Sequence, residues 1–124
     1  MNKIKAVVYV KSYTNDKKEM KEQEKELKEL CNRYDCEFVS IIKGGSEEDF
    51  GDVLFEVEND NEIGLVVIKN FDMISKDPKI QYQNYAYLDF FFHCDILTLD
   101  MGYDYDFEVK LLPLLKGGQK NNDK

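Results

Sequence analysis

The chain has 124 residues, 43% of them hydrophobic and 34% charged, which predicts one globular domain with a single core and no room for a second domain. A net charge of -8 opposes the phosphate backbone of nucleic acids, so autonomous DNA binding is disfavoured. The sequence shows neither a bilayer-spanning apolar stretch nor a signal peptide, so we expect no membrane partner and a cytoplasmic location.

The first part of the chain alternates strand, helix and strand. Residues 4–10 are β-rich and almost continuously apolar, the pattern of a strand that is covered on both faces. Residues 16–34 are highly charged, with apolar residues at helical spacing, which predicts a solvated amphipathic helix. A second strand is predicted at residues 37–42.

The same alternation continues. Ser46 is the predicted N-cap of a second helix, and the three acids after it suit the positive end of a helix dipole. Residues 59–61 break this helix. A strand is predicted at 63–69, a helix at 79–93 and a strand at 95–99, followed by a short helix at 107–115 and a flexible polar tail at 117–124.

This order predicts an α/β domain over residues 1–116, with three αβα layers around a mostly parallel sheet of four or five strands. The carboxyl ends of parallel strands form the crevice in which ligands bind. Two polar segments follow strands in this sequence, YVKSYTND at residues 9–16 and KNFDMISKDP at residues 69–78. We expect both to face one site.

Cysteine and histidine give no sign of a metal centre. The odd number of cysteines suits a reducing compartment, and their spacing lacks a metal-ligand pattern. We interpret them as small core residues: Cys31, Cys36 and Cys94. The single histidine, His93, has no ligand set around it in the sequence. We therefore expect neither a metal nor a cofactor.

The two polar segments resemble the catalytic domain of resolvase/invertase-type serine recombinases. In that family the first strand ends in Y-x-R-x-S-T, whose serine attacks a DNA phosphate, and this chain has YVKSYT from Tyr9 to Thr14. The third strand of the family ends in K-x-x-D-R-x-x-R-D, whose arginines hold the phosphate, and this chain has KNFDMISKD from Lys69 to Asp77. The family spacing Q-x-x-x-L-x-x-x-C recurs at Gln23, Leu27 and Cys31. The resemblance covers nearly the whole chain and implies the family's fold.

The resemblance also exposes departures. Tyr13 stands in the place of the serine, and Lys11, Met73 and Lys76 stand in the places of arginines. Planar guanidinium groups supply bidentate phosphate contacts that an ammonium group lacks. The only arginine, Arg33, lies outside the motif. Active members continue into a long oligomerisation helix and a DNA-binding domain, whereas this sequence ends at residue 124, so we expect the apparatus for strand exchange to be missing.

The resemblance leaves the roles of individual residues open. A tyrosine displaces the nucleophile by its longer side chain, and Ser12 would be the nucleophile only if the loop were re-registered. Asp72 either serves as the family's aspartate or caps the turn after the third strand. Gln23, on a highly charged helix, is predicted to be solvated. Lys11 and Lys76 either bind an anion or are surface lysines.

The predicted function is that of a catalytically degenerate relative of serine recombinases that acts by binding a protein, either an intact recombinase or a second copy of itself. One alternative is an active phosphoryl-transfer enzyme that uses Ser12 or Tyr13, with Lys11, Asp72 and Lys76 assisting. The other is a small-anion or nucleotide sensor in the same crevice. Aromatic residues are too many for one buried helical stripe at residues 82–92, so we expect some to be exposed on a partner surface. Tyr103, Tyr105 and Phe107 add to that expectation.

Overall fold

A computed structural model describes residues 3–45 and 50–103. The strands and helices expected in these ranges are confirmed, with small differences at their ends. They are β1 (Ile4–Lys11), α1 (Lys17–Arg33), β2 (Cys36–Gly44), α2 (Phe50–Asn59), β3 (Ile63–Ile68), α3 (Pro78–Phe92) and β4 (Asp95–Thr98). The structure adds a 3-10 helix that was not predicted, η2 (Phe71–Met73). The expected N-cap at Ser46, the aromatic residues Tyr105 and Phe107, the helix at 107–115 and the tail at 117–124 lie outside the described residues.

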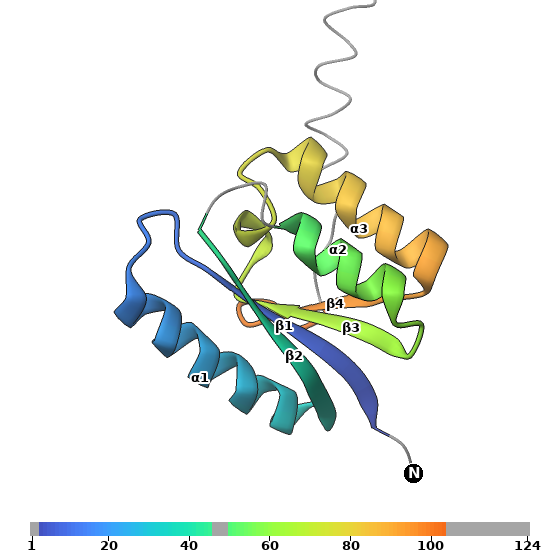
Figure 1. The fold of residues 1–124 in the computed structure, drawn as a ribbon, viewed down its shortest axis with the longest axis horizontal. Helices are drawn as coiled ribbons and strands as arrows, with labels where there is room; N and C mark the ends of the chain where they lie inside the picture. Colours follow the sequence, from blue (N-terminus) through green and yellow to red (C-terminus); the bar gives the residue numbers. More distant parts are fainter. Residues whose placement is uncertain (1–2, 46–49, 104–124) are drawn as a thin grey trace, which may run out of the picture.

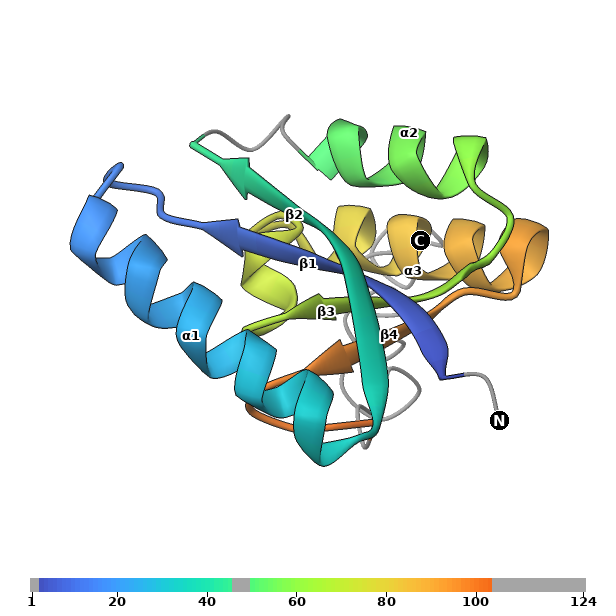
Figure 2. The ribbon, with the colours of Figure 1, turned by 60° about the horizontal axis from the view of Figure 1, so that its bottom comes forward.

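The described strands form one parallel sheet in the order β2-β1-β3-β4. Helix α1 covers one face of the sheet, and α2 and α3 lie side by side on the other (Figures 1 and 2). This is the expected three-layer α/β architecture. All four strands end at the same edge of the sheet, which is where the arrowheads point in Figure 2.

Side chains of β1 alternate between the two layers of the core. Val7 and Tyr9 pack into the apolar cluster beneath α2 and α3. Ala6, Val8 and Val10 pack into the second cluster, beneath α1. All five are fully buried, which explains why the strand is apolar almost throughout: it is covered on both faces.

Local signals fix where the helices begin. The carboxylate of Asp16 accepts hydrogen bonds from the backbone N–H groups of Lys18 (3.0 Å) and Glu19 (3.3 Å) and so caps α1. Asp77 caps α3 in the same way, through the N–H of Lys79 at 2.9 Å. Pro78 occupies the first position of α3, where its missing N–H has no partner to lose, so the helix starts slightly earlier than expected.

The three cysteines are free and buried, as expected of small core residues. Burial raises the pKa of the Cys94 thiol to about 12 and that of Cys31 to about 11, so both stay protonated near neutral pH. In residues 3–45 and 50–103, no group of His, Cys, Asp and Glu side chains gathers closely enough to hold a metal ion. No helix in these ranges is long and apolar enough to cross a bilayer.

Candidate functional site

The candidate site lies at the carboxyl ends of β1 and β3. These strands are neighbours in the sheet, so the residues that follow them meet at one edge (Figure 2). The structure brings together three of the side chains expected there, those of Lys11, Tyr13 and Lys76, and Asp72 joins them through its backbone carbonyl. The fifth, Ser12, bonds instead to the loop that leads to α1 and to α1 itself.

Tyr13 is the centre of this arrangement. The ammonium nitrogen of Lys11 lies 4.6 Å from the centroid of its ring, and that of Lys76 lies 4.5 Å from it. The phenolic hydroxyl donates a hydrogen bond to the backbone carbonyl of Asp72. Cations at this distance from a ring face are attracted by about 0.5–2 kcal/mol, depending on their exposure to water. Tyr13 thus joins the end of β1 to the segment after β3, and its hydroxyl is bound in that junction.

Lys11 is held in place from its backbone. Its N–H donates to Oε1 of Gln23 at 3.2 Å, and its carbonyl accepts from Nε2 of the same side chain at 2.7 Å. Both residues are buried, with exposures of 0% for Lys11 and 1% for Gln23. The expectation that Gln23 is solvated was therefore wrong. Its position four residues before buried Leu27, on the same helix face, is the signal that could have shown it to be an inward-facing residue.

The Ser12 side chain is buried, and its hydroxyl is hydrogen-bonded within the chain. Its side chain is 1% exposed, and its hydroxyl oxygen accepts hydrogen bonds from the N–H groups of Asp16 (3.0 Å) and Thr14 (3.3 Å). The same hydroxyl donates to a carboxylate oxygen of Glu19 at 3.4 Å and lies 3.1 Å from the Thr14 hydroxyl. These contacts organise the loop between β1 and α1.

The segment after β3 contains two of the motif positions, Asp72 and Met73. Met73 is 7% exposed and belongs to the apolar cluster beneath α2 and α3. The Asp72 carboxylate is exposed and accepts from Nε2 of Gln81 at 3.3 Å, while the same amide donates to the carbonyl of Ser75 at 2.8 Å. Gln81, in the first turns of α3, therefore braces this segment. Sequence reasoning did not single it out, because glutamine near a helix start carries no distinctive pattern.

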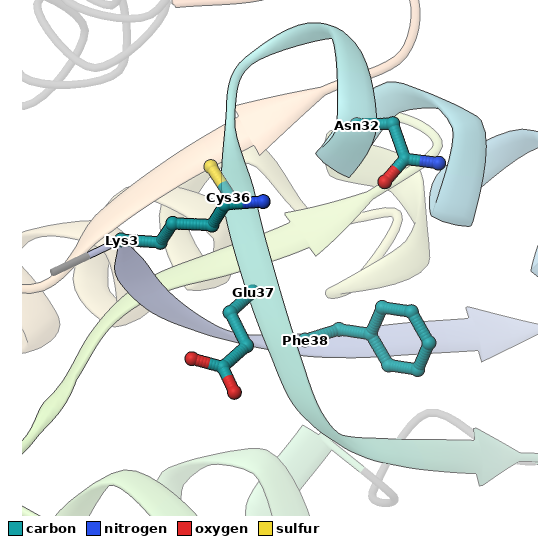
Figure 3. Close-up of a pocket in the computed structure, with 5 residues that line it drawn as sticks. All are labelled: Lys3, Asn32, Cys36, Glu37 and Phe38. Atoms are coloured by element: carbon teal, nitrogen blue, oxygen red, sulfur yellow. The ribbon is translucent and has the colours of Figure 1, made fainter. Parts of the chain in front are cut away.

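A shallow hollow of about 410 Å³ lies elsewhere, beside the beginnings of β1 and β2. Its lining residues are Lys3, Asn32, Cys36, Glu37 and Phe38 (Figure 3). Burial raises the pKa of the Cys36 thiol, which disfavours the thiolate that a nucleophile requires. Lys3 pairs with Asp35 at 3.4 Å. The thiol in this hollow is therefore a poor nucleophile, and the strand-end edge remains the candidate site.

The fold is placed by comparison with solved structures. No family model matches the sequence, and no curated protein matches it. A resolvase family site-specific recombinase from Streptococcus pneumoniae superposes with a TM-score of 0.78 at 11% identity, over 97% of this chain and 90% of that one. The N-terminal catalytic domain of TP901-1 integrase gives a TM-score of 0.70 at 13% identity, over 96% of each chain.

The C-terminal catalytic domain of ISC1926 TnpA, an IS607-like serine recombinase, gives a TM-score of 0.65 at 18% identity, over 90% of this chain and 78% of that one. The described chain therefore has the fold of a serine recombinase catalytic domain, as its strand-end motifs indicated. At these identities the likeness concerns the fold alone.

Proposed function

We propose that this chain is a relative of serine recombinase catalytic domains that no longer cleaves DNA and acts by binding another protein, an intact recombinase being the partner we favour. The observation that carries the proposal is the placement of Tyr13. Its ring lies against Lys11 and Lys76, and its hydroxyl is bound to the Asp72 carbonyl. The position that aligns with the family's nucleophile thus holds a side chain that is bound to other parts of the chain.

The geometry of the Tyr13 and Ser12 hydroxyl groups supports the loss of DNA cleavage. Phosphoryl transfer requires an oxygen that faces the phosphate in a near-attack position, together with positive groups around that phosphate. The Tyr13 oxygen is directed at a backbone carbonyl, and the Ser12 oxygen is engaged by Thr14, Asp16 and Glu19. Either oxygen would have to break these bonds before it attacked phosphorus.

The positive groups support the same conclusion. A serine recombinase is expected to hold phosphate through guanidinium forks at three positions, which are Lys11, Met73 and Lys76 in this chain. Met73 is part of the core and carries no charge. Lys11 is fully buried, with its ammonium group beside the Tyr13 ring. Of the three positions, Lys76 therefore carries the exposed cation.

A search for a covalent protein–DNA adduct tests the loss of cleavage. The full chain would be incubated with a library of random-sequence DNA duplexes and then denatured, so that only covalently joined DNA stays with the protein. We expect no adduct from the wild-type chain. An adduct that disappears in Tyr13→Phe or Ser12→Ala would establish the enzyme alternative and overturn this proposal.

A binding experiment tests the second half of the proposal. The purified catalytic domain of TP901-1 integrase serves as the probe, because its fold matches this chain over nearly its whole length. We expect co-elution in size-exclusion chromatography at concentrations at which each protein alone elutes as a single species. Failure to form a complex with this probe and with the Streptococcus pneumoniae recombinase would count against a recombinase partner.

A small-anion sensor is the second candidate function. The observation in its favour is that two ammonium groups, those of Lys11 and Lys76, approach one ring at the strand-end edge where such ligands bind. A ligand that binds only the folded state raises the melting temperature. Inorganic phosphate and ATP should therefore stabilise the wild-type chain and not Lys76→Met if the crevice is a sensor.

A further inference from the structure

Two exposed aromatic side chains and one half-buried aromatic side chain form a patch near the end of α3. We call Tyr87, Phe90 and Phe91 the α3 aromatic patch. Phe90 is 76% exposed and Phe91 is 64% exposed, although full burial of a phenylalanine is worth about 1.5–3 kcal/mol. The patch lies on the layer formed by α2 and α3, which run side by side (Figures 1 and 2). Exposed apolar groups that gather in this way mark interaction sites.

The patch is ordered by contacts within the chain. The Phe91 ring lies 5.2 Å from the ring of Tyr87 and 5.2 Å from that of Phe90. The Tyr87 hydroxyl donates a hydrogen bond to a carboxylate oxygen of Glu58 on α2 at 2.6 Å. These contacts hold the rings in place before any partner arrives, which reduces the entropy that binding would cost.

The surroundings of the patch are acidic. The first turns of α2 and α3 carry one charge of each sign, Asp52 and Lys79, and the later turns carry three acidic residues, Glu56, Glu58 and Asp89, and no lysine or arginine. Lys79 is in the first turn of α3, at the opposite end from Phe90 and Phe91. Asp95, which starts β4, has a pKa raised first by its own burial and then by the nearby charge of Asp89. The end of α3 therefore concentrates negative charge next to apolar rings.

This charge decides between two occupants. A second copy of the chain would bring the same acidic margin and a net charge of -8, so patch-to-patch association places like charges together. A segment that carries Lys or Arg beside apolar residues would bury the rings and pair with the carboxylates. Electrostatic complementarity of this kind sets partner choice.

We propose that the α3 aromatic patch is the docking surface for a cationic, apolar-faced segment of another protein. The segment places apolar side chains on Phe90 and Phe91 and positive side chains beside Glu58 and Asp89. The inference rests on the proposed function, since it names the surface and the partner chemistry for the protein binding proposed there.

Two synthetic peptides provide the probe. They share one pattern of leucines at helical spacing, and one carries lysines at the polar positions whereas the other carries glutamates. Binding of each labelled peptide to the full chain is measured by fluorescence anisotropy. We expect the lysine peptide to bind and the glutamate peptide not to bind. A failure of the lysine peptide to bind, or equal binding of both peptides, overturns the proposal.

Variants locate the binding. Phe90→Ser and Phe91→Ser remove exposed rings, and each should weaken binding of the lysine peptide by about tenfold, as expected for an interface anchor. Glu58→Gln keeps an oxygen for the Tyr87 hydroxyl and removes the charge, so it should weaken binding severalfold and reduce its salt dependence. Phe55→Ser is the matched control, because Phe55 is also 64% exposed and, within the described residues, makes no ring contact with the patch.

Each remaining outcome bears on the proposal. Unchanged binding in Phe90→Ser and Phe91→Ser, with circular dichroism showing the fold intact, overturns it. Self-association of the wild-type chain that Phe91→Ser abolishes shows that a second copy is the occupant and also overturns it. A covalent DNA adduct would overturn the proposed function, whether or not the peptides bind. Failed peptide binding without an adduct would overturn only the docking surface and leave the proposed function in place.

Discussion

Gln23 and Lys11 form a paired contact in which one side-chain amide satisfies both backbone groups of one residue. The amide nitrogen of Gln23 donates to the carbonyl of Lys11 at 2.7 Å, and the N–H of Lys11 donates to the amide oxygen at 3.2 Å. Both residues are buried, so water cannot replace Gln23. The contact fixes the end of β1 to α1 two residues before Tyr13.

Gln23→Leu should therefore destabilise the fold. Leucine has a similar volume but leaves a buried N–H and a buried carbonyl without partners, each at a cost of about 1–3 kcal/mol. Urea unfolding would measure the loss. Gln83→Leu is the control, because Gln83 is exposed on α3 and its substitution should change the free energy of unfolding by less than about 0.5 kcal/mol. Equal effects of the two substitutions would show that the Gln23 contact contributes nothing.

The sequence carried most of the information about the fold. Residues 6–10 of β1 and residues 65–68 of β3 carry no charged side chain, because both faces of these strands are covered there. The strand-end motifs predicted that the segments after β1 and β3 lie together, since the carboxyl ends of parallel strands share one edge. The expectation of exposed aromatic residues in the third helix was also confirmed, by Phe90 and Phe91.

The details of the site depended on contacts between distant segments. The highly charged neighbours of Gln23 concealed that it points inward. Tyr13 contacts Asp72 and Lys76, about sixty positions along the chain, so its orientation depends on how two loops pack. Periodicity reports which face of an element is buried, but it does not report which way a side chain turns once the strand has ended.

Alkaline pH should destabilise the protein through its buried thiols. The pKa of Cys94 is raised by burial from 9.0 to about 12. Above pH 9 the unfolded chain loses this proton while the folded chain keeps it, so the unfolded state binds fewer protons and the free energy of unfolding falls as the pH rises. The part of the free energy of unfolding that depends on the protonated Cys94 thiol is fully present below pH 9 and is lost progressively toward pH 12.

The slope for one thiol is about 1.4 kcal/mol per pH unit in that window. Urea unfolding at several pH values would measure it, and Cys94→Ala should reduce the slope by this amount while leaving the contribution of Cys31 in place. A pH dependence that is identical in the wild type and Cys94→Ala would mean that the Cys94 thiol does not titrate differently in the two states.

Met73→Arg should destabilise the protein and should not revive phosphate binding. Met73 is 7% exposed and packs in the apolar cluster beneath α2 and α3, so an arginine there either buries an unpaired charge or displaces its neighbours. We expect a loss of about 3–5 kcal/mol, the range typical of an uncompensated buried charge. Lys76→Arg, at an exposed position, should change stability by less than about 0.5 kcal/mol. Thermal melts of the two variants with and without phosphate check both statements.

The contact between Tyr13 and Lys76 should appear as a coupling energy in a double-mutant cycle. Tyr13→Leu and Lys76→Met each remove one partner of the cation–ring pair, and their effects on unfolding should fall short of additivity by about 0.5–1 kcal/mol, because Lys76 is exposed. Tyr13→Phe keeps the ring and removes only the hydrogen bond to the Asp72 carbonyl, so it should retain most of the coupling with Lys76. If Tyr13→Phe abolished the coupling as completely as Tyr13→Leu, the phenolic hydroxyl rather than the ring would join the end of β1 to the segment after β3.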